Sequence, residues 1–391
     1  MTVPPLYAPD YALTINSAPI PSALRASITS VRYEDGVNAA DRVEIGIANT
    51  NLRWLQQHIN GLGFGPSTFA IGTAQTNLTP AGLFDVDNSV ALSMGYSPGP
   101  LGEMFVGDIT GIEASFPAGG MPTMTVVAHD RLHRLAEGKY SRGFGFLPDM
   151  LIAAILSAEN LLIPAIDPTL AIASTAIAAV NFIFAGTGIK QKGQSDLELL
   201  TEIAATYDAD FWVDTNTLYI SRFWKSYSPS VTLTWGESLL DFSPKVNTAG
   251  RIGAAAMKFV LREIPLSFLV CVYWDFDSET LGVSIFPSEG AALLKSIVGP
   301  TYEIVDMPIR TPADLVNSAL VIVRELRTKL NARLTASGTC VGNPAVRAGA
   351  IIEFDGLGPD FSGNYRVRSA THTIDAGGYR TSFQVYKEII P

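Results

Sequence analysis

The sequence predicts a β-rich α+β fold in which one small β-domain occurs twice. Residues 90–127 and 350–385 both read as apolar strand, Gly/Pro turn, Phe-x-Gly step, second strand, Ala-Gly-Gly turn and third strand. Gly-Gly between alternating apolar runs is typical of a β-hairpin, because the tight turn needs positive φ. The alternative is a chance similarity of hairpins, but the shared order favours a duplication. The turn residues that match are Phe105, Gly107, Gly119 and Gly120 in the first segment and Phe361, Gly363, Gly377 and Gly378 in the second.

Length and composition limit the class of protein. A chain of 391 residues has room for two to four domains. Hydrophobic residues make up 47% of it and charged residues only 16%, so part of the surface is expected to be buried in an assembly. The net charge of −10 argues against a nucleic-acid binder, which needs a cationic face. Cys271 and Cys340 lie in apolar strand-like contexts and are expected to be reduced core residues.

The first region, about 1–130, is expected to be the first β-barrel. Alternating patterns predict strands at Tyr11–Asn16, Leu24–Asp35 and Arg42–Asn49. A helical turn is expected at 51–59, and the following glycine-rich GLGFGP loop is interpreted as a plain turn, since it lacks the ending of a phosphate-binding loop. The repeat segment then completes this region.

The second region, about 131–228, is expected to be an α+β middle domain. Helical periodicity covers Phe146–Leu156, and Ser195 and Glu198 have the spacing of a capping box. The helix that follows would pack one apolar face against the core. Phe211–Val213 and Leu218–Ile220 then read as a β-hairpin, whose aromatic side chains are expected to pack in the core.

One uncharged stretch, 168–189, is long enough to span a membrane. It contains several Ser, Thr and Asn residues and has basic residues on one side only, at Lys190 and Lys192. We therefore expect a buried, partly β element or an interface loop, and no stable membrane insertion. The start of the sequence shows neither the basic nor the apolar region of a signal peptide.

The last region is expected to hold the second β-barrel, formed by 229–262 and 332–391, with an α+β insertion at 263–331. Thr311 and Pro312 resemble an N-cap followed by proline at the first helical position, which predicts a long helix in the insertion. Glu325 and Lys329 on that helix can pair four residues apart.

The sequence shows no convincing catalytic, metal or cofactor site. His129 and His133 lie four residues apart, as a zinc pair on one helix would, but no third ligand is near and a polar helix start is favoured. The alternating Asp275, Asp277 and Glu279 are interpreted as a solvated strand edge. No nucleophile has a neighbouring base at a recognised spacing. We therefore expect no enzyme activity and no cofactor.

Three motifs resemble the late control protein D family, the baseplate hubs of contractile phage tails, which are related to the hub portion of VgrG spike proteins. The first is MFVGDITGIEASFPAGGMPTMTVVAHDRLHRLAEGK, beginning at Met104. The second is Gln194–Leu200 followed by the aromatic Phe211 and Trp212. The third is the C-terminal block with Tyr365 and His372. The apolar 168–189 stretch looks longer than the usual connector of the family.

The resemblance implies two tandem antiparallel β-barrels like those of tail-tube proteins, and a structural baseplate hub. Such hubs are homotrimers that join a sixfold inner tube to a threefold spike, and three duplicated chains supply six similar barrels. The implied partners are the tube or tube-initiator protein, a spike on a separate chain and other baseplate proteins, in a virion or injection-system particle assembled in the bacterial cytoplasm. The alternative is a secreted β-rich glycan-binding protein or a tail-associated hydrolase.

Overall fold

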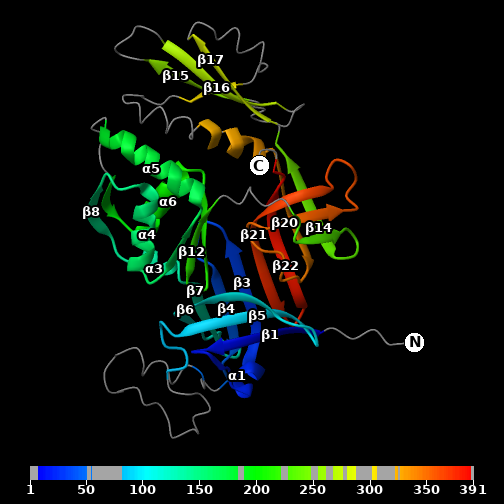
Figure 1. The fold of residues 1–391 in the computed structure, drawn as a ribbon. Coiled ribbons are helices and arrows are strands. Elements are labelled where there is room, and N and C mark those ends of the chain that lie inside the picture. The colour runs from blue at the N-terminus through cyan, green and yellow to red at the C-terminus, as the bar shows by residue number, and fades with distance from the viewer. Residues whose placement is uncertain are drawn as a thin grey trace.

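A computed structural model places two β units, a middle α/β region and a small separate sheet (Figure 1). In Figure 1 the first unit is mainly blue to cyan, the second is orange to red apart from its yellow-green first strands, and the middle region is green. The structure describes residues 8–50, 54, 82–183, 189–221, 228–247, 254–260, 267–275, 280–287, 302–305, 322–324 and 326–388. The GLGFGP loop, Asp277, Glu279, Thr311, Pro312 and Glu325 lie outside these residues, as does nearly all of the helical turn expected at 51–59.

The first unit contains the strands expected in the first region, in the hydrogen-bonded order β3-β4-β7-β6-β5-β1-β2. One expectation is wrong at its start, because the chain forms helix α1 before it enters β3. The elements are β1 (Ala8–Ile15), β2 (Ala18–Pro19), α1 (Ser22–Ser27), β3 (Ile28–Gly36), β4 (Arg42–Ala48), β5 (Ser89–Ser97), β6 (Gly102–Ser115) and β7 (Thr123–Asp130).

The second unit repeats this order as β14-β19-β22-β21-β20, with β13 added beside β20. The two units also share β-bulges at corresponding places, and β-bulges are defined features of a fold. Bulges interrupt β3 and β14 at their starts and interrupt β6 and β21 in mid-strand. The strands are β13 (Val231–Thr234), β14 (Leu239–Val246), β19 (Leu334–Val341), β20 (Ile351–Asp355), β21 (Gly363–Asp375) and β22 (Gly378–Tyr386).

The two units form one continuous sheet. Strand β21 of the second unit pairs antiparallel with β3 of the first, from Ser369 opposite Gly36 to Ile374 opposite Val31. Each unit keeps its own apolar cluster, but Ile374 and Tyr379 of the second unit belong to the core of the first. Strands that are more than 300 residues apart in the sequence are thus joined edge to edge.

The middle region packs helices against short strands. The capping box at Ser195 and Glu198 and the hairpin of β11 and β12 are both confirmed. Leu200, Ile203 and Tyr207 are buried, as the apolar face of the helix predicts. The elements are α3 (His133–Ala136), β8 (Tyr140–Gly145), α4 (Asp149–Glu159), β9 (Ile163–Ile166), α5 (Pro168–Ile183), β10 (Ile189–Gln194), α6 (Asp196–Thr206), β11 (Asp210–Asp214) and β12 (Thr217–Ser221).

The apolar 168–189 stretch is mainly the helix α5, so the expectation of a partly β element or a loop is wrong. Ala and Leu favour helix, and the hydroxyl of Thr175 bonds back to the carbonyl of Ala171 within it. Leu170 and Ile177 pack into the middle core, whereas Ile172, Phe182 and Ile183 are exposed. Among the described residues, no helix has the length and apolar character needed to cross a membrane.

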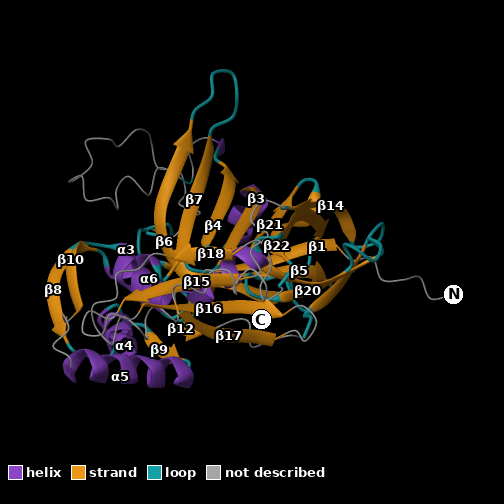
Figure 2. Cartoon of the chain, turned by 90° about the horizontal axis from the view of Figure 1, so that it is seen from above, coloured by secondary structure: helices purple, strands orange, loops and turns teal. Residues whose placement is uncertain are grey.

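A four-stranded sheet, β17-β16-β15-β18, is separate from the main sheet and lies above it in Figure 1, so that its strands overlap the main sheet when seen from above in Figure 2. Strand β15, the first of the four in the sequence, pairs with β16 and β18. An insertion boundary at residue 262 would therefore separate β15 from its own sheet. Residues 322–324 and 326–331 are helical. Cys271 and Cys340 are buried and free, as expected. The strands are β15 (Ala254–Val260), β16 (Ser267–Asp275), β17 (Thr280–Pro287) and β18 (Tyr302–Val305).

Candidate assembly interface

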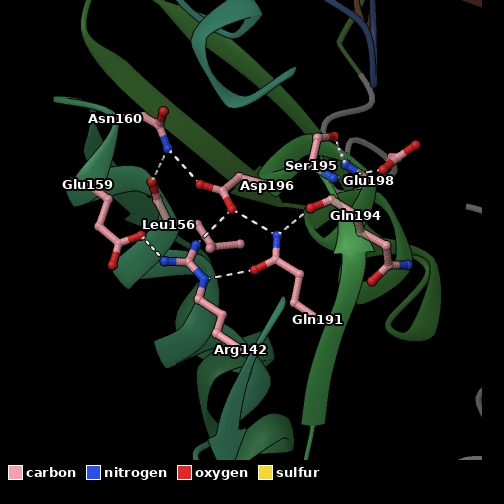
Figure 3. Close-up of polar contacts among 9 residues, drawn as sticks. All are labelled: Arg142, Leu156, Glu159, Asn160, Gln191, Gln194, Ser195, Asp196 and Glu198. Carbon is pink, nitrogen blue, oxygen red and sulfur yellow. Dashed lines mark hydrogen bonds and ion pairs between the residues drawn. The ribbon is translucent and has the colours of Figure 1, made fainter. Parts of the chain in front are cut away.

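The Gln-Ser-Asp-Leu motif organises a polar network in the middle region (Figure 3). Arg142 on β8 donates to Gln191 (2.7 Å), to Glu159 (2.6 Å) and to Asp196 (2.7 Å). Asp196 is almost fully buried, and it also accepts from Gln191 (2.9 Å) and Asn160 (3.1 Å). A buried carboxylate is tolerated when it is paired and hydrogen-bonded in this way.

The capping box completes this network at the start of α6. Ser195 Oγ accepts from the backbone N–H of Glu198 (3.1 Å), and the Glu198 carboxylate accepts from the N–H of Ser195 (2.7 Å). These two bonds satisfy backbone donors that a helix start leaves open. The motif thus joins β8, β10, α4 and α6 through side-chain hydrogen bonds.

A second polar cluster lies at the junction of the two β units. Arg347 donates to Asp35 (2.5 Å) and to the hydroxyl of Tyr33 (2.8 Å). Tyr33 in turn donates to Asp41 (2.6 Å). Burial raises the pKa of Asp130 to about 7, and burial together with the charge of Asp35 raises the pKa of Asp41 well above its usual range. Arg347 therefore supplies a positive charge beside Asp35, Asp41 and Asp130, and all four residues line a cleft of about 360 Å³.

His372 is a buried histidine of this junction. One ring nitrogen lies 2.9 Å from the carbonyl oxygen of Val346, and the other lies 3.0 Å from the hydroxyls of Tyr379 and Thr381. Its ring stacks on Tyr33 with centroids 5.9 Å apart. Burial lowers the pKa of His372 to about 4, so the neutral ring is a packing and hydrogen-bonding element between the units.

The histidines of the HDRLH segment do not share one helix, and the favoured polar helix start is found only at His133. His129 lies on β7, facing Thr110 (2.7 Å), while His133 is the first residue of α3 and contacts the carbonyl of Asp130 (2.6 Å). Across the described part of the chain, no group of three His, Cys, Asp or Glu residues is arranged to hold a metal ion.

The matched turn residues occupy several kinds of position. Phe105 is in the first core, and Gly107 lies so close to the carbonyl of His129 that a Cβ would collide with it. Phe361 instead lies in a loop that lines a surface cleft. Gly119 and Gly120 lie between β6 and β7, Gly363 is the first residue of β21, Gly377 lies in the turn before β22, and Gly378 is the first residue of β22.

The strand pairing gives a different correspondence at the Phe-x-Gly step. The bulge of β6 lies between Ile109 and Gly111, four residues after Phe105, and the bulge of β21 lies between Val367 and Ser369, four residues after Gly363. The counterpart of Phe105 in the ladder is therefore Gly363 rather than Phe361. Sequence identities alone could not show this, because a shift of two residues keeps the same side-chain alternation.

Two strand edges are left open within the described residues. Strand β5 covers β6 only as far as Asp108, so the edge of β6 from Gly111 to Ser115 has no strand partner. Strand β14 pairs with β19 on one side only. Open edges invite pairing with another chain. The exposed apolar residues near these edges are Phe116, Met121, Trp235, Leu240 and Val246.

No protein-family model matches this chain. None of the curated proteins matches its sequence. Solved structures do match it over nearly its whole length.

The chain is similar to the 43 kDa tail protein of prophage MuSo2 from Shewanella oneidensis, over 97% of this chain and 98% of that one, with TM-score 0.60 and 13% identity. It is similar to the tail protein from Neisseria meningitidis MC58 over 98% of both chains, with TM-score 0.60 and 11% identity. It also resembles an E. coli component of the type VI secretion system, over 97% of this chain and 80% of that one, with TM-score 0.53 and 10% identity.

The chain therefore has the fold of phage tail proteins and of a related secretion-system component. The E. coli component is itself described as structurally similar to two tail proteins of bacteriophage T4. The resemblance to baseplate hubs that the sequence motifs suggested is confirmed at the level of the fold.

Proposed function

We propose that this chain is the structural hub of a contractile phage-tail baseplate or of a phage-derived injection system. The observation that carries the proposal is the repeated strand order of the two β units within a tail-protein fold. The function is mechanical: the chain binds other proteins of the particle and catalyses no reaction.

The hub is a homotrimer in which the two units close as tandem barrels and alternate around a central channel. Each chain supplies two similar units, so three chains supply six, which matches a sixfold tube on one side and a threefold spike on the other. The open edges of β6 and β14 support this, because β14 is the last strand at one end of the strand order and β6 extends beyond its partner β5 near the other end. A heterologous contact that closes on itself covers such edges without forming fibres.

The proposed partners are the inner tube or tube-initiator protein, a separate spike protein and other baseplate proteins. The chain is assembled in the bacterial cytoplasm and becomes part of a virion or injection-system particle. The ion pair of Arg142 and Asp196, which joins the elements of the middle region, supports a structural role for that region next to the ring.

Sedimentation equilibrium on the purified full chain tests this function first. We expect a trimer, and negative-stain images should show a ring with six similar densities. A stable dimer, tetramer or hexamer would overturn the proposal. Incubation with peptidoglycan and with soluble glycans is the second measurement; we expect neither turnover nor saturable binding, whereas either result would favour a glycan-binding protein or a hydrolase.

A further inference from the structure

The internal junction shows how one β unit of this fold meets the next. On the edge of β21 that faces away from β22, strand β20 covers only Gly363 to Arg366, and β3 of the neighbouring unit pairs with the rest from Ser369 to Ile374. In this ladder Ile374 lies opposite Val31, and Thr371 lies opposite Glu34. Ile374 and Val31 are both buried in the first core.

The open edges are the counterparts of these two paired strands. Strand β6 has its bulge between Ile109 and Gly111, and β21 has its bulge between Val367 and Ser369. Aligning the two bulges places Phe116, directly after β6, where Ile374 lies in the second unit. The same alignment places Glu113 at the position of Thr371.

The bulges of β3 and β14 give the other half of the correspondence. They lie between Ile28 and Ser30 and between Leu239 and Asp241, each opposite the strand that follows in the sheet order. Aligning them places Phe242 where Val31 lies and Lys245 where Glu34 lies. The internal ladder therefore predicts Phe116 opposite Phe242 and Glu113 opposite Lys245.

Side-chain alternation supports this register independently. Ile112 packs against the first core, so Phe116 shares its face of β6 and Glu113 lies on the other face. Phe242 packs against the second core, so Lys245 lies on the other face of β14. Both predicted pairs thus bring together side chains of the same sheet face, the aromatic pair on the core side and the charged pair on the opposite side.

The surroundings of both pairs fit their chemistry. Phe242 borders a cleft of about 300 Å³ whose other lining residues are almost all apolar, and Phe116 is 60% exposed on the described surface. Glu113 and Lys245 are also exposed, and within the described residues neither has an ion pair. The remaining residues that line the cleft are Trp235, Pro244, Gly356, Leu357 and Phe361.

We infer that the open half of β6 pairs antiparallel with β14 of a second copy of this chain, with Glu113 opposite Lys245 and Phe116 in the cleft beside Phe242. This inference rests on the proposed trimer and adds to it the strands, the register and the side chains of each contact. It repeats between chains the junction that β21 and β3 make within one chain.

Charge reversal tests the pair of opposite charges. Glu113→Lys and Lys245→Glu each place like charges across the ladder, and each is expected to weaken every contact about fivefold, as measured by sedimentation equilibrium. The double variant restores opposite charges and is expected to recover the association of the wild type. If the double variant associates as weakly as the product of the two single effects, the pairing is overturned.

A matched aromatic substitution tests the cleft. Phe116→Ser is expected to weaken each contact by about tenfold to a hundredfold, because the buried ring is lost. Phe182→Ser on α5 removes an equally exposed ring, 68% accessible, and is expected to leave the trimer unchanged. Equal effects of the two substitutions would overturn the assignment of Phe116 to the contact.

Cysteine pairs test the register directly. The template pair Thr373 and Arg32 places Ser115 opposite Ser243, so Ser115→Cys with Ser243→Cys should form disulfides between chains and give a covalent trimer. Ser115→Cys with Asp241→Cys is offset by two residues and should cross-link poorly. The two native cysteines are buried and do not compete.

The cross-linking result separates this inference from the proposed function. A trimer by sedimentation that cross-links only through the offset pair, or through neither pair, overturns the register and leaves the hub proposal intact. A chain that is not a trimer at all overturns both.

Discussion

Strands β21 and β3 pair with each other at the internal junction, whereas their counterparts in the other unit, β6 and β14, each have an open edge within the described residues. At the internal junction the buried Tyr33, Asp35 and His372, together with the partly exposed Arg347, accompany the ladder. At the open edges the corresponding positions carry small and apolar residues, together with Glu113 and Lys245, the pair that we infer between chains. Alignment of the bulges places Pro244 where Tyr33 lies and Ala114 where His372 lies.

This difference separates a contact that folds from a contact that assembles. The internal junction forms once with its chain, so charged groups can be buried there as long as each finds its partner. The surfaces of a contact between chains are exposed to water before association. Apolar side chains with a charge at the rim are therefore more suitable there than a buried group of charges. We therefore expect substitutions at the internal junction to change the stability of the single chain, and substitutions at the open edges to change association.

The largest expected effect is the acid response of His372. Because its pKa in the folded chain is about 4, the unfolded chain takes up a proton more readily as pH falls below about 6.5. Stability is therefore lost as pH falls from about 6.5 to about 4, by about 3 kcal/mol. His372→Asn should remove most of this loss in urea unfolding followed across that range. An unchanged pH slope would show that His372 does not hold the junction.

Arg347→Ala is expected to destabilise the internal junction by about 2 kcal/mol, because it leaves the buried Asp35 carboxylate without its cation. The arginine side chain is about one-third exposed, so the cost is below that of a fully buried pair. Hydrogen exchange of the amides in β3 measures the effect locally. The control is Arg32→Ala, whose pair with Glu34 is exposed and is worth under about 1 kcal/mol. Equal loss of protection in both variants would contradict the prediction.

Asp130 is expected to give the opposite pH trend to His372, and Asp130→Asn should remove that trend. The pKa of Asp130 is raised to about 7, so the folded chain binds the proton more tightly and stability is lost as pH rises from about 4 to about 7. The amide removes that loss, so the variant should be more stable than the wild type at pH 8 and closer to it at pH 5. Urea unfolding at pH 5 and pH 8 measures this; a variant that is less stable at pH 8 would refute it.

The smallest expected effect on the single chain is that of Lys245→Ala. Its side chain is exposed on an open edge, so the free energy of unfolding should change by less than about 0.5 kcal/mol. The measurement is made at a concentration where sedimentation shows a monomer. A larger change would mean that β14 is already covered within the chain and would weaken the contrast between the two junctions.

Local patterns in the sequence predicted the local structure well. The capping box at Ser195 and the hairpin of β11 and β12 depend on residues three to ten positions apart, and both are present. The apolar stretch that became α5 was misjudged, because Ser and Thr can bond to the helix backbone and do not interrupt it. The cluster around Arg347 gave no sequence signal, since Asp35 and Arg347 are separated by 312 residues.

The sequence by itself determined that a β-hairpin unit occurs twice, where one helix begins, and that neither cysteine is needed for a bridge, because periodicity, capping and composition are local properties. Only the tertiary structure decided that β21 joins β3, that Phe105 corresponds to Gly363, and that β6 and β14 are left with open edges. Those outcomes depend on strand register and on which edges are already paired, and a sequence pattern with period two is the same for every even shift of register.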